Sequence, residues 1–158
     1  MGYRTELSGE LAISRGGRAA ALPQWLGDYL RAFSETRHCR CHGQELSKWM
    51  ADPEERYHRK SPHAEPNDWR MPDGYNDVTD GMPGLWCPWT VSQDNSKVVW
   101  NGWEKPYGIR EWLEYFIGTF LAPLGYGLDG EVEWRGEDGD GGTLEVRRNE
   151  VSGTAPCW

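Results

Sequence analysis

The spacing of hydrophobic residues constrains the fold more than any other feature of this chain. Near the N-terminus hydrophobic residues alternate with polar ones, as in a half-buried β-strand with a bend at Gly9. The residues that share its hydrophobic side are Tyr3, Leu7, Leu11 and Ile13. Two later segments have hydrophobic residues three and four positions apart, which predicts helices over about 23–36 and 109–121. The stripe of the first helix comprises Leu22, Trp25, Leu26, Tyr29, Leu30 and Phe33.

Strands account for the remaining patterned segments. Residues 85–92 and 97–101 have the composition of two strands joined by a polar turn, which predicts a hairpin. Alternation returns over 128–148, on either side of a glycine-rich acidic turn, and predicts a closing hairpin. The element order favours an α+β fold: an antiparallel sheet of about five strands with both helices on one face, similar to a split βαβ arrangement with one added strand.

Residues 37–83 differ in composition from the rest of the chain. They contain all four histidines, several prolines and many charged residues, but few aliphatic ones. The one element that we expect there is a short helix around Gln44–Met50, and the remainder has the character of a long irregular loop. The sequence therefore predicts a single domain over 1–151 with an irregular insertion at 37–83, followed by a C-terminal tail at 152–158.

Charge and hydropathy narrow the classes of partner and location. The net charge of -8 argues against sequence-independent nucleic-acid binding, because affinity for phosphate requires clustered Lys and Arg. Solubility explains this charge most simply, and mimicry of nucleic acid is the alternative. No apolar stretch approaches the length of a membrane span, and the first residues do not resemble a signal peptide. We therefore expect a cytoplasmic protein without a membrane partner, whose cysteines are mostly thiols or ligands.

Potential metal ligands cluster where the insertion begins. The candidates for zinc are His38, Cys39, Cys41 and His42. Only one residue separates the two cysteines, whereas structural zinc sites use pairs separated by two to four. Asp138 and Asp140 resemble the start of a calcium loop, but Gly142 occupies a position that requires a further ligand. We predict no cofactor, with zinc as the weaker alternative.

Tryptophan is the most informative residue type in this chain. Of ten tryptophans, six lie between Trp86 and Trp134. An indole is costly to expose to water and productive at binding surfaces. Periodicity assigns Trp112 and Trp134 to the core. Trp86 and Trp89 have opposite parity on the predicted strand, so one of them should face the helices. We expect Trp89 and Trp103 to form an exposed aromatic surface.

Several short motifs indicate a relationship to known sequences. They are Pro83-Gly84-Leu85-Trp86-Cys87, Glu104-Lys105, Glu111-Trp112-Leu113-Glu114-Tyr115 and Gly130-Glu131-Val132-Glu133-Trp134-Arg135-Gly136-Glu137-Asp138. Together with segments of 1–37, they resemble a family of small proteins found in bacteriophages, especially those of actinobacteria, and in some bacterial genomes. The family has no assigned activity, so the resemblance implies a phage context and no mechanism.

The chain departs from the family pattern at three places. Proline-rich sequence replaces a glycine-rich stretch ahead of the pair Tyr75-Asn76. Pro88 stands where members of the family tend to have glutamine, and Pro106 where they tend to have phenylalanine. Since proline donates no ladder hydrogen bond, Pro88 suits an edge strand or a bulge.

No phosphate loop, nucleophile elbow or dinucleotide fingerprint is present in the sequence. We therefore expect a phage-type accessory protein that acts as a non-enzymatic binding module on a host or phage protein or a small ligand, through an aromatic and acidic surface. The predicted binding residues are Trp86, Trp89, Trp103, Glu104, Lys105, Tyr107, Tyr75, Asn76, Glu137 and Asp138.

Two other functions are alternatives to a binding module. A carboxylate- or metal-dependent hydrolase would use Glu104, Glu137 and Asp138, brought together in a pocket. Cys87 could serve as a nucleophile, although a buried cysteine in a strand is commoner. A self-associating structural or virion component would instead use the tryptophan face.

Overall fold

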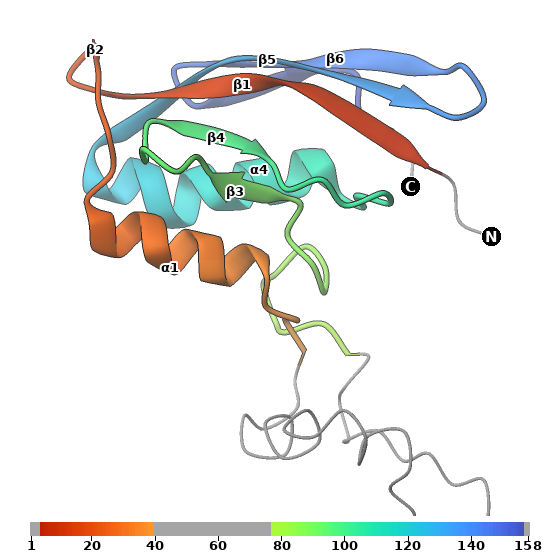
Figure 1. Cartoon of the computed structure of the whole chain (residues 1–158), viewed down its shortest axis with the longest axis horizontal. Helices are drawn as coiled ribbons and strands as arrows, with labels where there is room; N and C mark the ends of the chain where they lie inside the picture. Colours follow the sequence, from red (N-terminus) through yellow and green to blue (C-terminus); the bar gives the residue numbers. More distant parts are fainter. Residues whose placement is uncertain (1–3, 40–76, 157–158) are drawn as a thin grey trace, which may run out of the picture.

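The computed structural model describes residues 4–39 and 77–156 of the chain (Figure 1). The strands are β1 (Thr5–Arg15), β2 (Arg18–Ala19), β3 (Trp89–Val91), β4 (Lys97–Trp100), β5 (Tyr126–Gly136), β6 (Gly141–Arg147) and β7 (Glu150–Gly153). The α-helices are α1 (Gln24–Ser34) and α4 (Ile109–Phe116). Helix α4 continues as a π-helical segment, η1 (Ile117–Leu121), and a short 3₁₀ segment, η2 (Ala122–Leu124).

All the strands belong to one antiparallel sheet, in the order β3-β4-β1-β5-β6-β7, with β2 paired to the end of β1. Strands β1 and β3 run in the same direction on either side of β4, and α1 links them. Strands β4 and β5 likewise run in the same direction on either side of β1, and α4 links them. These are two interlocking split βαβ units. The predicted α+β class is confirmed, but the sheet has seven strands rather than about five.

The two additional strands were not predicted because they are too short to show a pattern of alternation. Strand β2 has two residues and follows the turn at Gly16-Gly17. Strand β7 pairs with β6 and includes Ser152 and Gly153, so the sheet extends two residues into the segment predicted as the C-terminal tail.

Strands β1 and β5 form the longest ladder, with eleven paired residues from Thr5↔Gly136 to Arg15↔Tyr126. Their alternation is as predicted, since one side of each strand is buried against the helices and the other is exposed. The side chains on the buried side include Leu7, Leu11, Ile13, Leu128, Val132 and Trp134. Gly9 has a φ of +116°, and a Cβ there would lie 2.4 Å from the Glu131 carbonyl oxygen, so the predicted bend requires glycine.

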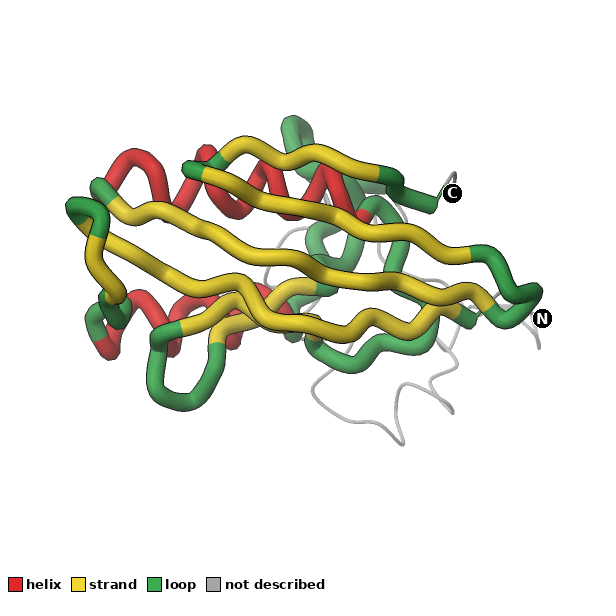
Figure 2. The backbone as a smooth tube through the Cα atoms, turned by 90° about the horizontal axis from the view of Figure 1, so that it is seen from above, coloured by secondary structure: helices red, strands yellow, loops and turns green. Residues whose placement is uncertain are grey.

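Both helices cover the same face of the sheet, as predicted (Figure 1). Seen from above the sheet, α1 lies under its β3–β4 side and α4 under its β6–β7 side (Figure 2). Helix α1 buries Leu26, Leu30 and Phe33, but Trp25 and Tyr29 are 64% and 54% exposed. The predicted stripe was therefore too wide. None of the helices within residues 4–39 and 77–156 has the length and apolarity needed to cross a membrane.

The two ends of the predicted insertion lie side by side. The His38 N–H donates to the Leu85 carbonyl over 2.8 Å, and the Thr79 N–H donates to the His38 carbonyl over 3.1 Å. Cys39 and Val78 form an isolated antiparallel bridge. The described parts of the chain on either side of residues 40–76 are thus bonded to each other. The helix expected at Gln44–Met50 lies outside the described residues.

The turn between β3 and β4 is bonded to α1. Asn95, at a φ of +63°, donates to Gln24 Oε1 and accepts from Arg31 Nη1 through its side chain, over 3.2 and 2.8 Å. Its carbonyl accepts from the Leu22 N–H over 2.8 Å. Gly27 provides the space for this contact, because a Cβ there would lie 2.0 Å from Asn95 Oδ1. The side chain at position 27 therefore controls how closely α1 approaches the sheet.

Substitution of Gly27 by alanine should destabilise the protein, although alanine favours helix formation elsewhere. We expect Gly27→Ala to lower the free energy of unfolding by about 1–3 kcal/mol, the usual cost of overpacking. Gly118→Ala is the matched control, since apart from its chain neighbours and the backbone of its own helix no atom would lie within 4 Å of its Cβ. Urea denaturation followed by circular dichroism measures both, and equal stabilities of the two variants would contradict this account.

Candidate functional site

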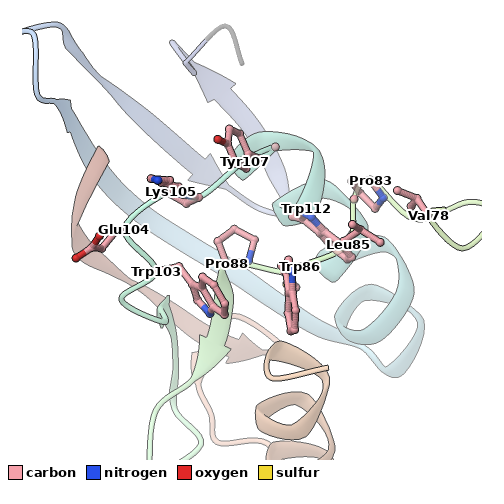
Figure 3. Close-up of a pocket in the computed structure, with 14 residues that line it drawn as sticks. Val78, Pro83, Leu85, Trp86, Pro88, Trp103, Glu104, Lys105, Tyr107 and Trp112 are labelled. Carbon is pink, nitrogen blue, oxygen red and sulfur yellow. The ribbon is translucent and has the colours of Figure 1, made fainter. Parts of the chain in front are cut away.

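A cavity of about 720 Å³ lies where three segments meet: residues 83–88, residues 103–108 and the first turn of α4 (Figure 3). Five of the predicted binding residues line it, namely Trp86, Trp103, Glu104, Lys105 and Tyr107. The other walls are mainly apolar and include Leu85, Pro88 and Pro106. The structure thus brings together half of the predicted set.

Two stacked tryptophans form one wall of the cavity. The ring centroids of Trp86 and Trp103 are 5.2 Å apart, with an angle of 29° between the rings. The guanidinium carbon of Arg37 lies 5.7 Å from the centroid of the Trp86 ring, within the range of a cation–π contact. Trp103 is 46% exposed, so the prediction of a solvent-facing indole at this position is confirmed.

The loop that carries Trp103 is held by Asn101. The Asn101 N–H donates to the Pro88 carbonyl over 2.9 Å, and its side-chain amide donates to the Cys87 carbonyl over 3.0 Å. Asn101 Oδ1 accepts from the Trp103 N–H over 3.1 Å. Since Asn101 bonds to both sides of the cavity, it fixes the spacing between the segments that carry Trp86 and Trp103.

The expectation that Trp89 is exposed is wrong. Trp89 is fully buried, and its indole nitrogen donates to the Ile109 carbonyl over 2.8 Å. Strand β3 begins only at Trp89, so Trp86 lies in the preceding loop and the alternation of a strand does not extend to it. The strand predicted over 85–92 is thus shorter, and the parity argument that compared Trp86 with Trp89 does not apply to Trp86.

Trp112 is a cavity residue that the sequence assigned only to the core. It is 1% exposed and packs against the rings of Phe33 and His38, with centroid distances of 5.9 and 5.5 Å. One edge of its indole nevertheless lines the cavity. Helical periodicity correctly predicted its burial, but no pattern in the sequence shows which edge of a buried ring borders a cavity.

The two charged residues of the cavity differ in their partners. Glu104 pairs with Arg4, with 3.3 Å between Oε1 and Nη2, and both side chains are about two-thirds exposed. The backbone carbonyl of Glu104 accepts from the Thr5 N–H over 3.0 Å. Lys105 is exposed at the rim and forms no ion pair with any residue that the structure describes. The ammonium group of Lys105 is therefore available to a ligand.

The remaining predicted binding residues lie elsewhere. Glu137 and Asp138 belong to the turn between β5 and β6 and do not line the cavity. The Glu137 N–H donates to the Arg4 carbonyl over 3.0 Å, which places this turn beside the Arg4–Glu104 pair. Tyr75 and Asn76 lie outside the described residues.

The zinc candidates are only partly described. His38 is buried against Phe33, and its Nε2 lies 3.0 Å from the Phe33 carbonyl oxygen, to which the neutral ring donates. Cys39 takes part in the bridge to Val78, while Cys41 and His42 lie outside the described residues. In the parts of the chain that the structure describes, no three His, Cys, Asp or Glu residues are grouped so as to hold a metal ion.

Cys87 is one of the residues that line the cavity, and its thiol is buried. Burial raises its pKa to about 12, and the weak hydrogen bond from Sγ to the Trp89 carbonyl opposes this only in part. A nucleophilic cysteine must be present as its thiolate. The structure therefore favours the packing role for Cys87 over the nucleophilic one.

Cys87 should resist alkylation as long as the protein is folded. Its side chain is inaccessible, and its raised pKa leaves almost no thiolate at neutral pH. We expect iodoacetamide followed by peptide mass spectrometry to leave Cys87 unmodified in the native protein and to label it fully in denaturant. Equal labelling rates in the two states would contradict this.

The stability of the fold should fall in mild acid because of His38. Burial lowers its pKa below the ordinary value of 6.5, and the bond to Phe33 opposes this in part. As the pH falls below that value, the unfolded state binds the proton first, so the free energy of unfolding decreases until the folded-state pKa is reached. Urea titrations across this pH range measure how the free energy of unfolding changes with pH. This dependence should be weaker for His38→Gln, which retains a donor for the Phe33 carbonyl. Identical pH dependences would contradict the assignment.

The chain matches no protein-family model, no curated protein and no solved structure. The resemblance to small phage proteins is not tested by these comparisons and stays a prediction.

Proposed function

We propose that this protein is a phage-type accessory protein that binds a small planar ligand in its aromatic cavity, without catalysing a reaction. The observation that carries the proposal is the stacked pair Trp86–Trp103 in the wall of a cavity of about 720 Å³. The phage context comes from the sequence motifs, and with it a location in the cytoplasm of the host cell. The proposal involves neither a membrane nor nucleic acid as partner.

The dimensions and chemistry of the cavity support this proposal. Small-molecule sites are typically concave, about 300–1,000 Å³ in volume, and mostly apolar with a few polar groups. Here prolines, Leu85 and the tryptophan rings supply the apolar surface, while Lys105 and Tyr107 are exposed at the rim. Such a combination holds a ligand by contact area and orients it by a small number of polar contacts.

The exposure of Trp103 also supports a binding role. At 46% exposure, this indole leaves much of its apolar surface in water, in a molecule that buries Trp89 and Trp112 almost completely. An indole stacked at the mouth of a cavity gains favourable contacts when a planar ring covers it. A ligand would therefore bury surface that the fold itself leaves exposed.

The carboxylate-dependent hydrolase receives less support from the same geometry. Of its three candidate residues, Glu104 lines the cavity but is paired with Arg4, while Glu137 and Asp138 lie in the β5–β6 turn. Acid–base catalysis by two carboxyl groups needs environments that separate their pKa values. The cavity wall contains a single carboxylate, so the binding module is the stronger proposal.

Removal of Trp103 should weaken ligand binding without unfolding the protein. We expect a panel of planar aromatic fragments to raise the melting temperature of the wild type, measured by circular dichroism. For the fragments that bind, Trp103→Ala should lower the affinity about two- to tenfold, the range for the loss of one aromatic stacking partner.

Trp25→Ala is the matched control for this experiment. Trp25 is another exposed indole, at 64% exposure, but it lies on α1 and does not line the cavity. This variant should bind every fragment as the wild type does. The proposal fails when no fragment binds, or when Trp25→Ala and Trp103→Ala weaken binding equally.

A further inference from the structure

The cavity combines an apolar interior with two hydrogen-bond donors that have no partner among the described residues, Lys105 and the indole of Trp112, and this combination points to a particular class of ligand. We propose that it binds planar aromatic carboxylates whose ring carries a second hydrogen-bond acceptor. The ring would lie against Trp86 and Trp103, the carboxylate at Lys105, and the second acceptor at the indole N–H of Trp112. This inference rests on the proposed ligand-binding function and specifies the ligand's charge and polarity.

The charge of the cavity rim favours an anion, although the protein as a whole has a net charge of -8. The one carboxylate in the lining, Glu104, already has Arg4 as its partner. Lys105, the adjacent residue, has no ionic partner among the described residues. An ammonium group at the edge of an apolar cavity attracts an anion more strongly than a neutral molecule of the same shape.

The start of α4 adds to this local positive potential. Gly108 is the N-cap residue of α4, lines the cavity and supplies no side-chain cap. Unbonded backbone N–H groups in the first turn of a helix carry a partial positive charge. Glu111 in the same turn is exposed and does not line the cavity, but its Oε2 would lie 3.7 Å from a Cβ at Gly108, so its charge offsets part of this potential.

Trp112 supplies a hydrogen-bond donor at the inner end of the cavity. No acceptor within residues 4–39 and 77–156 receives a hydrogen bond from its indole nitrogen. The nitrogen is not fully enclosed either. Two side-chain polar atoms of the described residues are fully enclosed without a hydrogen-bond partner, Thr5 Oγ1 and Trp100 Nε1, and Trp112 Nε1 is not one of them. Figure 3 shows the nitrogen of Trp112 turned toward the cavity.

A donor in this position selects ligands by polarity. The Trp112 side chain is held by the rings of Phe33 and His38, so the nitrogen cannot turn to another acceptor. A hydrocarbon placed over it would prevent its hydration without replacing the lost hydrogen bond. Gly84 leaves the approach open, since a Cβ at this position would lie 3.3 Å from Trp112 Nε1. A ring with an oxygen or nitrogen acceptor at its inner end is therefore preferred.

The charge requirement can be tested with two probes of nearly equal shape. We expect 2-naphthoate to bind more tightly than the neutral 2-naphthalenemethanol in isothermal titration calorimetry. Lys105→Gln should reduce the affinity for 2-naphthoate about two- to fivefold, as expected for an exposed ion pair, and leave that for the alcohol unchanged. Lys97→Gln removes the same charge from a residue that pairs with Glu10 and does not line the cavity, so it should have no effect.

The donor requirement needs a third probe. Quinoline-6-carboxylate is a 2-naphthoate in which a nitrogen acceptor replaces one CH group of the ring. We expect it to bind several-fold more tightly than 2-naphthoate, as for one added hydrogen bond of about 1 kcal/mol. Gly84→Ala, whose methyl group covers Trp112 Nε1, should remove this advantage, while Gly118→Ala should retain it.

The outcomes separate this inference from the proposed function. Binding of both naphthalene probes with equal affinity, and without an effect of Lys105→Gln, would overturn the inference and leave a general aromatic site. Equal affinity of the quinoline and naphthalene carboxylates in the wild type would remove Trp112 from the site and overturn the second-acceptor requirement. Failure of all three probes, and of the wider fragment panel, would overturn the proposed function itself.

Discussion

The ladder between β1 and β5 is the interaction on which the rest of the structure depends. It joins eleven residue pairs and lies at the centre of the sheet, with β4 and β6 bonded to its outer edges. Both split βαβ units use β1: it begins the unit that contains α1, and it separates the two strands of the unit that contains α4. Since each helix packs where its flanking strands direct it, the register of β1 against β5 positions the whole helical layer.

The cavity arises where the chain leaves this ladder. Strand β4 pairs with β1 only at Leu11 and Ala12 and ends at Trp100. The chain then continues past the first half of β1 as a loop, with one backbone hydrogen bond from Thr5 to Glu104. Because residues 101–108 are not constrained by a regular ladder, their side chains can line a hollow between the sheet edge and α4.

The sequence predicted the elements better than the site, and Trp89 shows why. Periodicity shows which residues share one side of a strand, but the choice of the side that becomes core depends on what packs against it. Here Ile109 of α4 offers a carbonyl to the Trp89 indole, so Trp89 is buried. Strand β3 also begins only after Pro88, later than expected, which places Trp86 in a loop. The burial of Trp89 depends on a contact between distant segments, which no local pattern contains.

The location of the cavity was nevertheless partly predictable. Trp103 and the residues after it lie between two predicted elements, where aromatic side chains have no periodic reason to be buried. The expectation of an exposed indole at Trp103, with Lys105 and Tyr107 beside it, is confirmed, whereas the same expectation for Trp89 is wrong. The sequence could not place Trp112 or Arg37 at this site. Trp112 belongs to α4 and Arg37 follows α1, and both meet the loop only in the folded chain.

The distribution of charge explains how an acidic protein can present a cavity suited to an anion. The exposed side of the central strands carries carboxylates, among them Glu10 and Glu131, which face one another across the β1–β5 ladder. Trp112, by contrast, enters the cavity from the helix side of the sheet. Water and salt screen charges over about 10 Å. Carboxylates on the far side of the sheet therefore repel a bound anion much less than an adjacent ammonium group attracts it. Net charge therefore governs the solubility of this protein, while Lys105 and Trp112 govern the chemistry of the cavity.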